Sequence, residues 1–285
     1  MRRLWALALI FLTLRAAGAE VFFDAPPREN WYQSPLLRLT AFSAGQSDCM
    51  LIECGGEAMM VDGGTAAYGE ELIHAMHELG VEEFKYLFNT HYHEDHAGGL
   101  IVLMENGFEI GSYLHPYEPN AIYSNRNHRR AMSAVRSLGI AQRQIANGDA
   151  LLLGEAVITL IRHEEGKSAN GRSALAHVRF GSVSMLLTAD ITGDTQSWCV
   201  ANVDPAMLDV DILKAPHHGV SAMVGDFLRS VSPEMLLVNN EAQSAKEGLS
   251  QAADFDLPAL CTGDGRVVLE TDGEDWYVYQ QKNAF

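Results

Sequence analysis

Apolar and polar residues alternate over short segments in the first third of the chain, and glycine-containing turns separate these segments. This period of two predicts β-strands at residues 36–43, 49–54 and 58–62. Between residues 70 and 79 the apolar positions recur at helical spacing, which predicts a helix. A further strand is expected at 84–88, directly before a histidine-rich segment.

The rest of the chain continues the alternation of strands and helices. Helices are expected at 126–138 and near Gln196 and Asp226. Strands are expected at 151–153, 156–162, 174–180, 183–188, 209–214, 235–239, 267–270 and 276–279. No proline- or serine-rich linker divides residues 20–285. The pattern therefore predicts one α/β domain with mixed sheets over residues 20–285.

The first nineteen residues have the pattern of a secretory signal peptide. Arg2 and Arg3 precede an apolar run over residues 4–14, and the small residues Ala17-Gly18-Ala19 resemble a cleavage site. This run is too short to span a bilayer, which needs about 20 residues. A buried N-terminal helix is the alternative. We expect a signal peptide at residues 1–19 and a secreted or extracytoplasmic protein with no membrane span in its mature chain.

Charge and cysteine content restrict the function further. The net charge is −17, which argues against a scaffold that holds nucleic acid on a broad basic surface. It favours a small or short anionic substrate bound at a local positive centre, such as a metal. The four cysteines form no C-x-x-C pair, and Cys49 and Cys54 are expected on opposite faces of one strand. We therefore expect small buried cysteines rather than a cysteine metal site.

The segment His91-Tyr92-His93-Glu94-Asp95-His96 indicates a metal site. It follows the predicted strand 84–88, and the ends of strands are where α/β proteins place reactive groups. Imidazole and carboxylate ligands suit Zn²⁺. His91 and His93 would project to one side, and the turn would bring Asp95 and His96 to a second ion.

Two other strand ends supply the groups that a two-metal site still lacks. Asp190 follows the apolar strand 183–188, and His217-His218 follows the strand 209–214. Taken alone, Asp190 would be a helix N-cap and the two histidines part of a turn. Next to His91–His96, we interpret them as ligands.

The combined motifs resemble the metallo-β-lactamase-fold hydrolases, and among these the soluble domain of ComEC-type DNA-uptake proteins. The resemblance covers residues 36–239. It rests on residues 44–48, 61–64, 90–100, 170–173, 186–190 and 213–219. It implies an αβ/βα sandwich of two mixed sheets flanked by helices.

The resemblance also implies metal ligands. His91 and His93 would hold one zinc ion, Asp95 and His96 the other, and Asp190 would bridge the two. One of His217 and His218 would complete the ligand set, with His218 favoured. Zn²⁺ is the expected metal, with two ions, and Mn²⁺ is the alternative.

Four departures from the family pattern affect this site. Ala189 replaces the usual glycine before Asp190. No histidine occupies the family's third motif; Asn170 lies near that place, and His163 is a possible substitute. No histidine follows strand 235–239, so the second metal would be weakly held or open. Val220 replaces the serine that often follows the paired histidines.

The resemblance implies a metal-dependent hydrolase in which Asp95 and Asp190 orient the nucleophile. Lys214 could contact an anionic substrate, although a strand-end lysine with its ammonium group in solvent is the favoured interpretation. The leading hypothesis is an exported zinc-dependent phosphodiesterase that acts on a nucleic acid, a nucleotide or an envelope component. The alternatives are a hydrolase of a thioester or lactam and a secreted metal-binding module without turnover.

Overall fold

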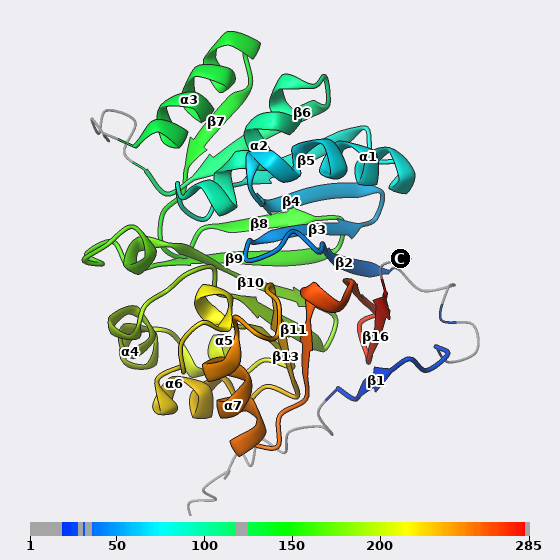
Figure 1. Ribbon diagram of the computed structural model, residues 1–285, viewed down its shortest axis with the longest axis vertical. Helices are drawn as coiled ribbons and strands as arrows, with labels where there is room; N and C mark the ends of the chain where they lie inside the picture. The colour runs from blue at the N-terminus through cyan, green and yellow to red at the C-terminus, as the bar shows by residue number, and fades with distance from the viewer. Residues whose placement is uncertain (1–18, 28–30, 32–35, 118–124, 283–285) are drawn as a thin grey trace, which may run out of the picture.

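The computed structural model describes residues 19–27, 31, 36–117 and 125–282. The predicted signal peptide lies outside these residues, apart from Ala19. Two β-sheets pack face to face, and helices cover the outer face of each (Figure 1). This is the expected αβ/βα sandwich. Among the described residues, no helix is long and apolar enough to cross a membrane.

The first sheet has nine strands in the order β1-β16-β15-β2-β3-β4-β5-β6-β7. Their bounds are β1 (Val21–Phe23), β2 (Leu37–Ala41), β3 (Cys49–Cys54), β4 (Glu57–Gly63), β5 (Glu83–Phe88), β6 (Glu109–His115), β7 (Ala141–Gln144), β15 (Arg266–Thr271) and β16 (Trp276–Gln281). Strands β4 to β7 run parallel, so β5 and β6 end at the same edge. That edge carries the histidine motif.

The second sheet has seven strands in the order β14-β13-β12-β11-β10-β9-β8. Their bounds are β8 (Ala150–Leu153), β9 (Ala156–Arg162), β10 (Ala174–Phe180), β11 (Val183–Leu187), β12 (Ile212–Lys214), β13 (Met235–Val238) and β14 (Ala259–Cys261). Strands β11 to β14 are parallel, which brings the ends of β11 and β12 together. Asp190 and the paired histidines follow these two ends.

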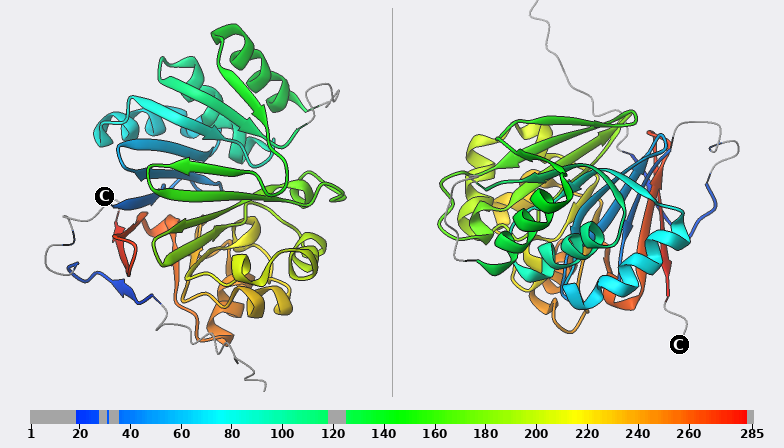
Figure 2. Two further views of the ribbon diagram at one scale, coloured as in Figure 1. Left: turned by 180° about the vertical axis from the view of Figure 1, so that it is seen from behind. Right: turned by 90° about the horizontal axis from the view of Figure 1, so that it is seen from above.

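The helices divide between the two outer faces (Figure 2). The first sheet is covered by α1 (Gly69–Leu79), α2 (Glu94–Glu105) and α3 (Arg126–Leu138). The second is covered by α4 (Gly193–Asn202), α5 (Pro205–Leu208), α6 (Gly225–Val231) and α7 (Lys246–Asp254). This arrangement leaves the strand ends free to carry the functional residues.

Alternation within the strands fills both faces of each sheet. In β3, Met50 and Ile52 join the cluster between the sheets, whereas Cys49 and Leu51 join the cluster under α1 and α2. Cys54 lies in the inter-sheet cluster, so the two cysteines occupy opposite faces as predicted. All four cysteines are free and buried.

The predicted strands correspond to observed ones, with one substantial error in extent. The strand expected at 209–214 is reduced to Ile212–Lys214. Residues 209–211 are neither helix nor strand and follow the short helix α5, which ends at Leu208. That helix begins at Pro205, and the Asp204 carboxylate caps it by accepting a hydrogen bond from the Ala206 N–H. The sequence interpretation did not identify β1, β6, β7, β14, α5 or α7.

Candidate metal centre

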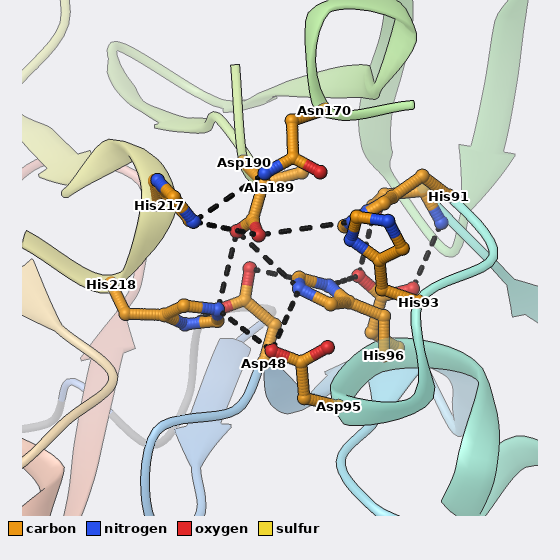
Figure 3. A network of polar contacts seen from close by, with 12 residues as sticks. Asp48, His91, His93, Asp95, His96, Asn170, Ala189, Asp190, His217 and His218 are labelled. Atoms are coloured by element: carbon orange, nitrogen blue, oxygen red, sulfur yellow. Dashed lines mark hydrogen bonds and ion pairs between the residues drawn. The ribbon is translucent and has the colours of Figure 1, made fainter. Parts of the chain in front are cut away.

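The candidate site lies where strands of both sheets end. The loop after β5 carries His91 and His93, and the first turn of α2 carries Asp95 and His96. The second sheet contributes Asp190 after β11 and His217-His218 after β12. Figure 3 shows these side chains converging on one another.

Asp62, at the end of β4, forms hydrogen bonds that hold the loop carrying His91 and His93. Its carboxylate accepts hydrogen bonds from the Thr90 N–H at 2.8 Å and from the Thr90 hydroxyl at 2.5 Å. It also lies 2.7 Å from His96 Nδ1, which leaves Nε2 of that ring for a metal. Asp62 is fully buried. We conclude that it orients His96.

The two glycines of the motif let α2 approach β4. A Cβ on Gly99 would lie 1.9 Å from the carbonyl oxygen of Gly63, and a Cβ on Gly98 would lie 2.3 Å from the Ala66 nitrogen. No other residue fits at either position. The contact fixes the first turn of α2, and with it Asp95 and His96.

Two groups of potential ligand atoms share Asp190. One group contains His91, His93 and Asp190, and the other contains Asp48, His96, Asp190 and His218; within each, the atoms lie within 4.8 Å of one another. Asp190 Oδ2 is 3.7 Å from His91 Nε2. Its Oδ1 is 3.3 Å from Nε2 of both His96 and His218. One buried carboxylate is therefore placed to bridge two ions.

Asp95 approaches the second group from the same side as Asp190. Its Oδ2 is 3.4 Å from His218 Nε2 and 3.9 Å from His96 Nε2. Asp48, in contrast, approaches the opposite ring nitrogens, 3.2 Å from His218 Nδ1 and 3.9 Å from His96 Nδ1. The Nε2 atoms face Asp95 and Asp190, so we assign Asp48 to orienting the imidazoles.

His217 and His218 have left-handed backbone, with φ of 49° and 55°. Such φ values are unfavourable for residues with a Cβ and persist only where other contacts hold them. The His217 N–H donates to the Ala189 carbonyl at 2.9 Å, and Asn240 Nδ2 donates to the His218 carbonyl at 3.1 Å. The turn buries His218 among the carboxylates and leaves His217 partly exposed at the rim.

Ala189, which replaces the family's glycine, also has left-handed backbone, with φ of 48°. Its carbonyl accepts hydrogen bonds from Lys214 Nζ and from the His217 N–H, both at 2.9 Å. Asp190 still lies within reach of both groups of histidines. With alanine at position 189, the loop therefore still places Asp190 in the site.

The histidines differ in their affinity for protons. Burial lowers the pKa of His91, of His93 and of His217, which keeps them neutral and able to bind a metal. Burial also opposes the charged form of His218, but Asp48, Asp190 and Asp95 outweigh it and raise its pKa to about 10. For His96 too, carboxylates outweigh burial and hold the pKa well above its ordinary value.

The donor set fits divalent metal ions. Among the described residues, several buried atoms of the cluster lack hydrogen-bond partners: His96 Nε2, His218 Nε2 and Asp190 Oδ1. Buried polar atoms are normally satisfied, and a cluster of imidazole nitrogens and carboxylate oxygens without partners is typical of a metal site. The atoms therefore match what one or two metal ions would require.

Of the additional candidates, Asn170 reaches the site and His163 does not. Asn170 Nδ2 lies 3.4 Å from His217 Nε2, and its Oδ1 is buried without a partner among the described residues. The ring of His163 stacks on Trp198, with centroids 4.7 Å apart, and is in neither ligand group. The end of β9 carries His163 to the side of α4.

Lys214 is placed differently from the expectation. The residue is completely buried, and its Nζ lies 2.5 Å from Asp48 Oδ2. The prediction that its ammonium group lies in solvent is therefore wrong, and so is the prediction that it contacts a substrate directly. The alternation of β12 points this side chain inward, where Asp48 compensates its charge.

Asp48 and Asp62 were missed as members of the site. Both are fully buried carboxylates at strand ends, and both lie in the family motifs used for the resemblance. The sequence signal that could have identified them was an acidic residue beside Gly-Gln-Ser and another before Gly-Gly, in an otherwise apolar context.

Comparisons with known proteins agree with this architecture. The family model of the metallo-beta-lactamase superfamily matches residues 43–232. The fold is similar to that of CmlA, a diiron beta-hydroxylase from Streptomyces venezuelae, with a TM-score of 0.53 and 15% identity over 87% of this chain. The match covers 55% of CmlA, so the chain spans about half the length of that protein.

A second similar structure is YhfI, a metallo-beta-lactamase fold protein from Bacillus subtilis. Its TM-score is 0.52 at 11% identity, covering 79% of this chain and 96% of YhfI. A comparison with curated proteins gives no match. At these identities the similarity to solved structures shows the fold alone.

Proposed function

The chain belongs to the metallo-beta-lactamase superfamily, and from this premise we propose that it is an exported, zinc-dependent phosphodiesterase. The superfamily supports metal-dependent hydrolysis in general. The phosphodiester substrate, zinc as the metal and export are our inferences. Export rests on the sequence pattern of residues 1–19, and the phosphodiester on the ComEC-type motifs around the metal site.

The observation that carries the proposal is the position of Asp190 between two groups of histidines. Its two oxygens face different groups, Oδ2 towards His91 and Oδ1 towards His96 and His218. Paired ions a few ångströms apart suit displacement at phosphorus, because they hold both the attacking and the leaving oxygen. When bound, such ions lower the pKa of a coordinated water and neutralise negative charge that develops on the substrate.

The protein's own residues provide a floor and a rim. His91, His96, His218 and Asp190 are buried and form the floor. His93, Asp95 and His217 are partly exposed and form the rim, which is the side open to a substrate. The pKa of Asp95 lies below its ordinary value, because hydrogen bonding to His218 and the charge of His96 outweigh its burial. Ionised Asp95 can accept a hydrogen bond from the attacking water and orient it.

The test combines metal content with activity. Zinc- or manganese-loaded protein should cleave bis-(p-nitrophenyl) phosphate and contain about two metals per chain. Asp190→Asn should lose metal and at least about 100-fold in kcat/KM. Asp226→Asn is the matched control, because this aspartate is exposed on α6 and pairs with Arg229.

Other results would change the assignment. No cleavage of bis-(p-nitrophenyl) phosphate or of single-stranded DNA by metal-loaded protein would contradict the phosphodiesterase. Turnover of a chromogenic cephalosporin without phosphodiesterase activity would favour a carbonyl substrate. Export predicts a mature chain that begins at Glu20, which N-terminal sequencing of secreted protein would detect.

A further inference from the structure

Arg162 is a buried arginine without a counter-ion among the residues that the structure describes. It ends β9, keeps 8% of its surface, and has its Nε atom buried without a hydrogen-bond partner. Within the described part of the chain its guanidinium makes no ion pair and no hydrogen bond; only its backbone N–H bonds to Asn147. Buried charges are normally paired because burial without a partner is costly. Arg162 therefore requires an explanation.

The position of Arg162 places it at the edge that carries the metal centre. Ile158 and Leu160 face the space between the sheets, and Arg162 continues this alternation by two residues. Its register partner on β10 is Ala174, whose N–H donates to the carbonyl of Thr90 at 3.1 Å. Thr90 directly precedes His91. The backbone of Arg162 is therefore connected through Ala174 and Thr90 to His91, the first of the predicted metal ligands.

A second observation places the guanidinium near the end of β6. Burial is the main reason that the pKa of His115 falls to about 4, and the charge of Arg162 acts in the same direction. The ring of His115 stacks on Tyr117, which packs against Tyr92 beside His93. These ring contacts therefore link the surroundings of Arg162 to His93 through His115, Tyr117 and Tyr92.

The charge balance of the site gives this arginine a role. Carboxylates dominate the centre, and the whole chain carries a net charge of −17, so a polyanionic substrate is repelled except at the metals. Lys214, a fully buried cation at the centre, is already paired with Asp48. Arginine is suited to phosphate because its planar fork donates two parallel hydrogen bonds.

We propose that Arg162 binds a second phosphate group of the substrate, next to the phosphodiester that is cleaved at the metals. This inference rests on the proposed function and narrows its substrate class to nucleotides or oligonucleotides with at least two phosphates. Arg162 acts as a specificity-determining residue: it places the neighbouring phosphate and takes no part in bond cleavage.

The test measures binding separately from turnover. The probes are adenosine 5′-monophosphate and adenosine 3′,5′-bisphosphate, titrated by calorimetry into zinc-loaded full-length protein. Wild type should bind the bisphosphate at least tenfold more tightly, and Arg162→Gln should abolish this advantage while changing monophosphate affinity less than threefold. Arg143→Gln is the matched control, because Arg143 is an exposed arginine that is already paired with Asp149 at 2.8 Å.

Several results would overturn the proposal. It fails if Arg162→Gln keeps the preference for the bisphosphate, or if it weakens both ligands equally. Arg162→Met tests whether the arginine has a structural role instead. Removing an unpaired buried charge should leave the melting temperature unchanged or raise it. A lower melting temperature would indicate a structural role and contradict the proposal. Bisphosphate binding that depends on Arg162 without phosphodiester cleavage would uphold this site and contradict the proposed reaction.

Discussion

The ammonium group of Lys214 lies 2.5 Å from Asp48 Oδ2, and both residues are completely buried. Lys214 also donates to the carbonyl of Ala189, the residue before Asp190. Asp48 contacts His218 Nδ1 and accepts a hydrogen bond from Asn239. One ion pair therefore connects the loop that carries Asp190 to His218, which follows the end of the neighbouring strand β12.

Lys214→Met should destabilise the protein strongly. It leaves Asp48 buried without its main counter-charge and removes a donor from Ala189, and breaking a buried pair costs about 3–5 kcal/mol. Urea unfolding would measure the loss. The control is Lys85→Met, because Lys85 and Glu57 are both partly exposed and such pairs contribute at most about 1 kcal/mol. Equal losses of unfolding free energy in the two variants would show that the buried ion pair stabilises the protein no more than the exposed one.

Ala189→Gly should change the free energy of unfolding by less than about 1 kcal/mol. Glycine relieves the left-handed backbone of Ala189, which offsets its greater flexibility in the unfolded chain. Ala176→Gly, in a buried strand with ordinary backbone, lacks this relief and should lose more than about 1 kcal/mol. Thermal unfolding of both variants would compare them; a larger loss for Ala189→Gly would contradict the argument.

Much of the fold could be predicted because its central strands are apolar runs with clear ends. Val183–Leu187 is an example: the run is buried and stops at a polar residue. Strands β6 and β7 escaped prediction because Glu109 and Gln142 give them a mixed, partly exposed pattern. The polar strand β7 is ordered by pairing with β6, which is a tertiary contact that local sequence does not report.

The site was predictable where ligands are concentrated in one motif, and less so where single residues contribute. The structure brings together His91, His93, Asp95, His96, Asp190 and His218 as the motifs implied. The role of Lys214 depends on Asp48, which lies far from it in sequence and on the other sheet. No local pattern distinguishes a lysine that points inward to such a partner from one that reaches solvent.

Zinc binding should release protons. In metal-free protein the carboxylates outweigh burial; they hold the pKa of His96 well above its ordinary value and raise that of His218 to about 10. Because both rings then favour the protonated form, a metal must displace a proton from each, about one per ring at pH 7. A weakly buffered titration with an indicator dye should show about two protons released per chain on full loading. His218→Gln should release about one fewer, whereas His74→Gln, an exposed helix position, should match wild type. Zinc binding without proton release would contradict the protonated state of these rings.

Acid should destabilise the protein through His115. Its pKa is about 4 in the folded state, mainly because of burial, against an ordinary value of 6.5. Between pH 6.5 and 4 the unfolded chain takes up a proton that the folded chain does not, so stability falls as the pH falls, by up to about 3 kcal/mol. Below pH 4 both states are protonated and this contribution stops changing.

His115→Asn isolates that contribution, because asparagine keeps an acceptor near the Tyr117 N–H but does not titrate. Urea unfolding from pH 7 to pH 4 should show wild type losing about 3 kcal/mol more than His115→Asn. His74→Asn removes an exposed histidine and should follow the wild-type curve. Parallel curves for wild type and His115→Asn would mean that His115 takes up its proton equally in the folded and unfolded chains, contrary to its burial beside Arg162.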